Sequence, residues 1–127
     1  MSAPVVIVVD DEALLRWAVA ESLMAAGYAV WQAENAADAY RCLDRAQSSP
    51  IVVVLDLKLP DSSDLSVARK IMGQRPDAPV IMMTAHGSAQ DKAEAEAAGV
   101  YKFIQKPFDL SEMTAVVREA SAKLGHR

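Results

Sequence analysis

Short apolar runs that do not alternate with polar residues recur along the chain. Residues 5–9 read Val-Val-Ile-Val-Val and residues 51–55 read Ile-Val-Val-Val-Leu. Because both runs are continuously apolar and rich in β-branched residues, each is typical of a strand covered on both faces of a sheet. Weaker runs at residues 80–83 and 101–104 predict two more strands, and the more polar run 28–33 predicts a fifth at a sheet edge.

Between these runs the apolar positions follow helical spacing. In the first such stretch Leu15, Val19 and Leu23 recur every four residues, and Gly27 marks the end of the helix. Similar patterns predict four further helices, over residues 36–46, 64–72 and 88–98 and from residue 109 onward. The third is expected to end at Gly73, and the fourth to be capped by Ser88 and to end at Gly99. Strict alternation of five strands with five helices favours an α/β fold, a doubly wound parallel sheet with helices on both faces.

Composition narrows the class of protein without identifying it. The 127 residues, 52% hydrophobic and 24% charged, fit one globular domain with one core. A net charge of −4 gives no support to nucleic-acid binding by this segment. A single Cys42 and the lack of any apolar run that could span a bilayer predict a reducing, cytoplasmic setting. We expect residues 1–122 to form the domain and residues 123–127 to begin a connector or a frayed end.

Polar residues that suit phosphoryl chemistry follow the predicted strands. Ligands of such sheets bind beyond the carboxyl ends of the strands, so residues at these ends are expected to converge on one site. In chain order they are Asp10, Asp11 and Glu12, then Asp56, then Thr84, then Lys106. Each residue alone has an ordinary explanation, such as an acidic first turn that complements a helix dipole. The prediction therefore depends on their joint placement.

Three carboxylates at close range repel one another unless a cation joins them. An oxygen-rich cluster with room for waters suits Mg2+, and Asp56 beside it would be an ionised nucleophile for phosphorus. Lys106 would supply a positive charge and Thr84 a hydroxyl to the moving oxygens.

Taken together, the segments resemble the receiver domain of bacterial two-component response regulators, from Val5 to about Ala122. The resemblance implies a flavodoxin-like (βα)5 fold with strand order 2-1-3-4-5. The matching segments are Val8-Val9-Asp10-Asp11-Glu12, Leu55-Asp56-Leu57-Lys58-Leu59-Pro60, Met83-Thr84-Ala85-His86-Gly87 and Lys106-Pro107-Phe108.

The resemblance also implies a role for each matching residue. Asp56 would be the phosphorylated aspartate, Asp11 a direct Mg2+ ligand, and Asp10 the acid that holds metal-bound water. The backbone carbonyl of Lys58 would be the third protein ligand to the metal.

The remaining matches concern the phosphoryl group and the switch. Lys106 would pair with the phosphoryl group and Thr84 would turn towards it, while Phe103 would swing inward as Thr84 moves. The Lys106–Pro107 bond is expected to be cis.

The implied phosphodonor is a histidine kinase or phosphotransfer protein, and the implied output surface is the fourth helix, fifth strand and fifth helix. Receivers of transcription activators, including the enhancer-binding kind, have similar segments, which predicts an output domain that controls transcription. Two alternatives stay open: a stand-alone receiver or the regulator of a longer chain, and a monomer or a homodimer formed on phosphorylation. Such a domain promotes its own phosphorylation and dephosphorylation and is a signalling module rather than an enzyme.

Two rival functions use similar folds. A haloacid-dehalogenase-like phosphatase needs a second carboxylate two residues after its nucleophile, where this chain has Lys58. A flavin site needs glycines and hydroxyls in the first loop, where Asp10-Asp11-Glu12 would repel phosphate.

Two local features depart from the common pattern. Asp64 stands where the family usually has glycine, and it or Ser63 is expected to cap the third helix. The apolar positions of the fourth helix are all alanines, so we expect that helix to be loosely anchored.

Overall fold

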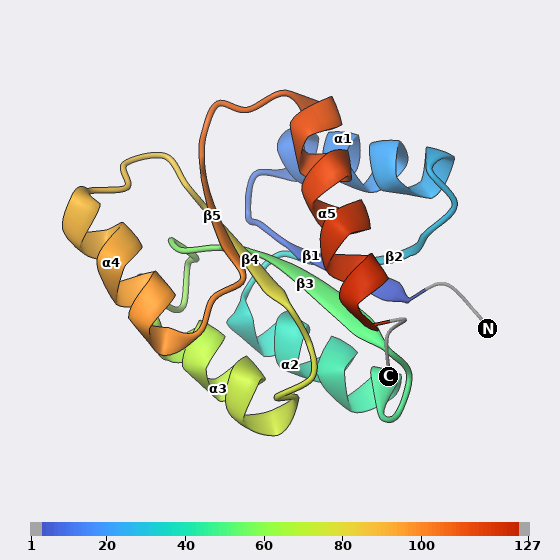
Figure 1. The fold of residues 1–127 in the computed structure, drawn as a ribbon, viewed down its shortest axis with the longest axis horizontal. Helices are drawn as coiled ribbons and strands as arrows, with labels where there is room; N and C mark the ends of the chain where they lie inside the picture. Colours follow the sequence, from blue (N-terminus) through green and yellow to red (C-terminus); the bar gives the residue numbers. More distant parts are fainter. Residues whose placement is uncertain (1–3, 125–127) are drawn as a thin grey trace.

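Five parallel strands form a single sheet in the computed structural model, which describes residues 4–124 (Figure 1). The spatial order is β2-β1-β3-β4-β5, and every neighbouring pair is parallel. This confirms the predicted fold class and strand order. The strands are β1 (Val5–Val9), β2 (Ala29–Ala33), β3 (Ile51–Asp56), β4 (Val80–Thr84) and β5 (Lys102–Gln105).

Helices cover both faces of the sheet. On one face lie α1 (Ala13–Ala25) and α5 (Leu110–Leu124), and on the other lie α2 (Ala36–Ala46), α3 (Ser66–Gln74) and α4 (Ala89–Ala98) (Figure 1). Successive side chains of a strand point to opposite faces, and the two cores divide accordingly.

Alternate residues of β1 show the division. Val6 and Val8 pack with α1 and α5, whereas Ile7 and Val9 pack with α2 and α3. The central strands β1 and β3 are almost wholly buried, which explains their continuous apolar sequence.

The helix boundaries agree with the predicted glycine signals at two of three places. Gly27 and Gly99 both adopt positive φ, 101° and 104°, and end α1 and α4 as expected. Gly73, by contrast, lies inside α3, which continues to Gln74. The start of α3 is also later than predicted: its N-cap is Leu65, which makes no side-chain cap hydrogen bond, so the expectation that Asp64 or Ser63 caps this helix is wrong. The Asp64 carboxylate instead accepts a hydrogen bond (2.9 Å) from the backbone N–H of Ser66, the first helical residue.

The last two helices differ in how many of their apolar side chains are buried. Within α4 only Ala95 is fully buried, whereas α5 buries Met113, Val116, Val117 and Ala120. The N-terminus of α4 is nonetheless well formed, since the predicted cap Ser88 and the side chain of Asp91 make a reciprocal capping box. Helix α5 reaches Leu124, and the predicted connector over residues 123–127 lies partly outside the described residues.

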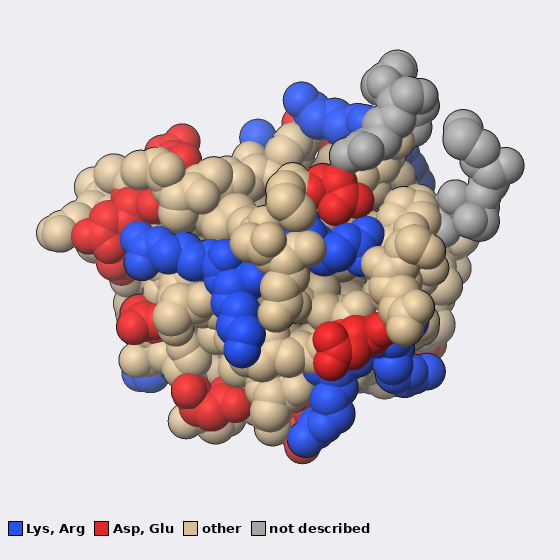
Figure 2. Space-filling view, turned by 90° about the horizontal axis from the view of Figure 1, so that it is seen from below, with Lys and Arg blue, Asp and Glu red and all other residues tan. Residues whose placement is uncertain are grey.

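The surface carries both signs of charge. Seen from below, the face that bears α2 and α3 shows Lys and Arg side chains among Asp and Glu side chains (Figure 2). No helix within residues 4–124 is both long and apolar enough to cross a membrane.

Candidate functional site

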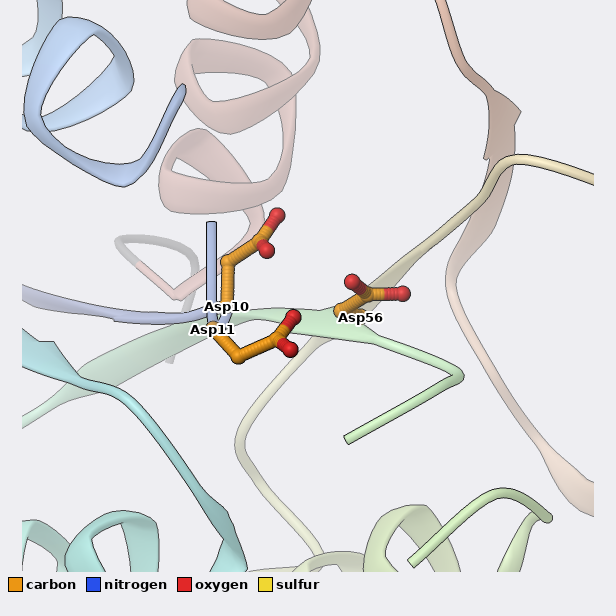
Figure 3. A group of neighbouring side chains, drawn as sticks. All are labelled: Asp10, Asp11 and Asp56. Atoms are coloured by element: carbon orange, nitrogen blue, oxygen red, sulfur yellow. The ribbon is translucent and has the colours of Figure 1, made fainter. Parts of the chain in front are cut away.

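The carboxyl ends of β1 and β3 bring three aspartates together. Val9 is in register with Leu55 on the neighbouring strand, so the residues that follow them, Asp10 and Asp56, are side by side. Carboxylate oxygens of Asp10, Asp11 and Asp56 lie within 4.8 Å of one another, and Figure 3 shows Asp11 projecting towards Asp56. Asp10 and Asp56 are buried, whereas Asp11 is exposed. The sequence prediction that these side chains converge is confirmed.

Lys106 joins this cluster from the loop that follows the edge strand β5. Its Nζ donates to Asp10 Oδ2 (3.0 Å), Asp56 Oδ2 (3.0 Å) and Glu12 Oε1 (2.9 Å). The Lys106 backbone N–H donates to the Thr84 carbonyl (2.7 Å), and the bond to Pro107 is cis, as expected. The lysine therefore bridges the ends of β1 and β3 while its backbone is held by β4.

The electrostatics of the cluster follow from burial and from this one cation. Burial raises the pKa of Asp10, and the Glu12 backbone N–H and the Lys106 ammonium oppose that rise. Burial alone would lower the pKa of Lys106, but its hydrogen bonds to Glu12, Asp10 and Asp56 raise it above the ordinary value. Lys106 is therefore firmly charged, yet one ammonium faces several carboxylates, so the site retains excess negative charge.

Thr84 and Phe103 come together at the end of β4. Thr84 is buried, and its Oγ1 accepts a hydrogen bond from the His86 N–H (3.3 Å). A Cβ built on Gly87 would lie 2.6 Å from the Thr84 methyl carbon and 2.7 Å from an edge carbon of the Phe103 ring. Both side chains thus occupy the space that a Cβ would need at Gly87, so the two predicted switch residues lie next to the same glycine.

The loop after Asp56, residues 57–65, forms a wall of the cleft. The Leu57 N–H donates to the Met83 carbonyl (2.9 Å), and the Lys58 N–H donates to Asp56 Oδ1 (3.1 Å). Lys58 lines the open cleft together with Asp11, Asp56, Thr84 and Lys106. Five of the predicted site residues therefore line one cavity, whereas Asp10 and Phe103 are not among its lining residues.

Two residues at this site carried no predicted role. Glu12 is part of the acidic run, but its bond to Lys106 depends on a fold that joins residues 94 apart in sequence. Arg16 lies on α1, where its guanidinium donates to the Asp10 carbonyl (2.7 Å) and to Gln32 Oε1 (3.1 Å). It fixes the loop that carries the aspartates, and nothing in its sequence spacing signals that contact.

The donor set suits a hard divalent cation. Carboxylate oxygens are preferred ligands of Mg2+, and a cluster open on one side leaves room for the waters that Mg2+ retains. The single ammonium of Lys106 does not balance all the carboxylates of the cluster, and this remaining negative charge favours the binding of a cation. The arrangement fits a magnesium site with a neighbouring carboxylate nucleophile.

Comparison with known proteins gives a consistent picture. A model of the family described as response regulator receiver domain matches residues 6–118. The DNA-binding transcriptional regulator NtrC of Escherichia coli (strain K12) is 33% identical over 94% of this chain. The probable transcriptional regulatory protein TcrX of Mycobacterium tuberculosis is 35% identical over 94% of the chain. The chain spans a quarter of the length of NtrC and half that of TcrX.

Solved structures show the same fold. The receiver domain of NtrX from Brucella abortus superposes with a TM-score of 0.83 at 32% identity, covering 92% of this chain and 98% of that one. The beryllofluoride-activated NtrC4 receiver domain dimer gives a TM-score of 0.86 at 29% identity, covering 94% of this chain and 98% of that one. The family match over residues 6–118 and the relatives above 30% identity show that the chain belongs to the response regulator receiver domain family.

Proposed function

We propose that this chain is a phosphoacceptor whose Asp56 takes a phosphoryl group from a histidine kinase or phosphotransfer protein in the cytoplasm. The observation that carries the proposal is the bridge made by Lys106 between buried Asp56 and buried Asp10. A lysine so placed can pair with the Asp56 carboxylate before transfer and with the phosphoryl group on Asp56 after it. The domain is then a signalling module, not an enzyme that turns over free substrates.

Magnesium would be held by Asp11 and Asp56, with Asp10 holding a metal-bound water and the Lys58 backbone carbonyl as a further ligand. Bound Mg2+ would neutralise charge that develops on the phosphoryl oxygens. Asp10 is buried and tied to Lys106, which suits an indirect role, whereas Asp11 is exposed to the cleft. The chain thus supplies both a direct ligand and an acid that keeps its position.

In the transfer step, an Asp56 carboxylate oxygen attacks the phosphorus of the phosphohistidine. The new O–P bond forms as the N–P bond breaks, and the leaving imidazole nitrogen takes a proton from solvent. Lys106 stays protonated and pairs with a phosphoryl oxygen, and the Thr84 hydroxyl turns from its contact with the His86 N–H to donate to another. No general base is needed, because a carboxylate nucleophile has no proton to lose on attack.

Movement of Thr84 would reach the surface through Phe103. The ring shares its contact at Gly87 with the Thr84 methyl, so displacement of the threonine changes the space open to the ring. The surface formed by α4, β5 and α5 would then carry the signal to an output domain of the same chain. The relatives NtrC and TcrX are transcriptional regulators, so this output domain would control transcription. That output domain would lie outside these residues.

The proposal is tested by incubating the protein with Mg2+ and acetyl phosphate and measuring intact mass. We expect one added phosphoryl group on the wild type and none on Asp56→Asn, with the exposed carboxylate variant Asp44→Asn labelled like the wild type. Beryllofluoride in place of the donor should shift Thr84 and Phe103 resonances only when Asp56 is present. A stable label on Asp56→Asn, or no label on the wild type, would contradict the assignment. Steady release of phosphate from a generic phosphomonoester would favour the phosphatase instead.

A further inference from the structure

Asp61 makes a long-range contact that neither the fold nor the proposed chemistry requires. Although the residue is exposed, its Oδ1 accepts from the Ala36 N–H (2.9 Å) and its Oδ2 from the Ala37 N–H (3.2 Å). These are the first two backbone N–H groups of α2, some 25 residues earlier in the chain. Both carboxylate oxygens are engaged, and these hydrogen bonds lower the pKa of Asp61, so it is ionised at neutral pH.

The same residue lies in the tight turn that follows the cleft wall. The Leu59 N–H donates to the Ser62 carbonyl (2.6 Å) and the Ser62 N–H returns a bond to the Leu59 carbonyl (3.2 Å), with Pro60 and Asp61 between them. Leu59 itself is buried in the core shared with α2. Lys58 is therefore held between a strand end on one side and this clamped turn on the other.

Helix α2 also has a cap from its own sequence. The Asn35 side chain accepts from the Asp38 N–H (2.8 Å), which is the ordinary cap of the helix. Asp61 adds a second cap, supplied by a different loop. The bonds made by Asp61 thus tie the loop to α2, whereas the bond made by Asn35 is local to α2.

We propose that Asp61 is a positioning residue for the metal site: it fastens the loop of residues 57–65 to α2 and so holds the backbone of Lys58 against the cleft. This inference rests on the proposed function, because the backbone of Lys58 is the intended ligand. Metal ligands held by outer contacts bind more tightly than ligands on a mobile loop. Removal of the clamp is expected to weaken Mg2+ binding without removing any ligand.

Three variants separate positioning from capping and from charge. Asp61→Ala removes the charge and both acceptors, Asp61→Asn removes the charge but keeps one acceptor oxygen, and Asn35→Ala removes a cap of the same helix without touching the loop. Mg2+ affinity is measured by calorimetry and Mn2+ affinity by electron paramagnetic resonance, with thermal melts and 15N–1H spectra for each variant. The spectra also report the Lys58 and Leu59 amides.

We expect Asp61→Ala to weaken both metals about tenfold and to shift the amides of residues 58 and 59. Asp61→Asn should retain most of the affinity, and Asn35→Ala should match the wild-type affinity while melting at a temperature as low as Asp61→Ala. Wild-type affinity in Asp61→Ala, or equal losses in Asp61→Ala and Asp61→Asn, or in Asp61→Ala and Asn35→Ala, would overturn the inference. If the wild type itself bound neither metal, the proposed function would fail first and this inference with it.

Discussion

Substitution of Lys106 by Met is the most direct test of the electrostatics at this site. Methionine keeps a flexible chain of similar length but removes the only ammonium that contacts the buried carboxylates in the described part of the chain. The lysine side chain is 10% exposed, Asp10 is fully buried and Asp56 is 6% exposed, so solvent cannot replace the lost partner fully. The free energy of unfolding should therefore fall.

Removing one partner of a buried ion pair costs about 3–5 kcal/mol, because the other charge is left uncompensated. We expect a value near the lower end, about 3 kcal/mol, for two reasons. Glu12 is the third partner of the lysine and is largely exposed, so it loses little. Burial already raises the pKa of Asp10, so this carboxyl can be protonated once the lysine is gone, which limits the penalty and makes it smaller at lower pH.

The assay is urea unfolding followed by circular dichroism without divalent cations, for Lys106→Met, Asp10→Asn and the double variant. Because Asn at position 10 removes one of the two buried carboxylates that lose their partner with Lys106, the double variant should be more stable than the sum of the single effects by about 1–3 kcal/mol. Lys102→Met is the matched control, since this lysine is exposed on β5. Saturating Mg2+ should stabilise Lys106→Met more than the wild type, because the site is then more negative.

The reasoning is refuted if the two single effects add to within about 0.5 kcal/mol, which is the spread found for independent sites. It is equally refuted if Lys106→Met unfolds at the same urea concentration as Lys102→Met. Either result would mean that the lysine and the aspartates are hydrated well enough not to depend on one another.

Three further predictions concern the surroundings of the site. Gly87→Ala should cost about 1–3 kcal/mol in urea unfolding, because its methyl would overlap the Phe103 ring; Gly73→Ala, where a Cβ meets nothing within 4 Å, should not destabilise. In a spectrophotometric titration at high pH, Tyr101 should ionise at about 12, since partial burial and the Glu119 carboxylate raise its pKa. The protonated Tyr101 hydroxyl should then stabilise the fold fully below pH 10, and this contribution should be lost as the pH rises towards 12. Glu119→Gln should lower the pKa of Tyr101. In hydrogen exchange, α4 should be less protected than α5 in the unphosphorylated protein; equal protection would contradict loose anchoring.

The alternation of strands and helices is readable from sequence because burial on both faces demands continuous apolar runs. The residues of β1 and β3 match their predicted ranges almost residue for residue, and β3 extends one residue further to include Asp56. The predicted boundaries of α3 were wrong: the N-cap is Leu65 rather than Asp64 or Ser63, and the helix runs past the exposed Gly73, since glycine within a helix costs only about 1 kcal/mol. Local signals set helix ends only where tertiary packing does not compete.

The site was predictable to the same extent that strand ends were. Asp10, Asp56 and Thr84 converge because they end neighbouring parallel strands, and this follows from topology alone. The bonds of Lys106 to Glu12 and of Asp61 to α2 depend instead on how far two loops extend and how they pack. No spacing in the sequence encodes such contacts, because the partners are set by the closed fold.

The loop of residues 57–65 shows how this chain manages without the glycine common in its family. A glycine there would allow a left-handed backbone, yet among the described residues Gln47 is the non-glycine residue with positive φ, so Asp64 needs no such freedom. Its carboxylate instead binds the Ser66 N–H, while Asp61 binds α2. The loop shape is therefore fixed by two carboxylate–backbone contacts, one at each end of residues 61–64. Both contacts are made by aspartate side chains, so side-chain hydrogen bonds here take the place of the conformational freedom that a glycine would give. The geometry of the cleft wall then depends on residues outside the cleft.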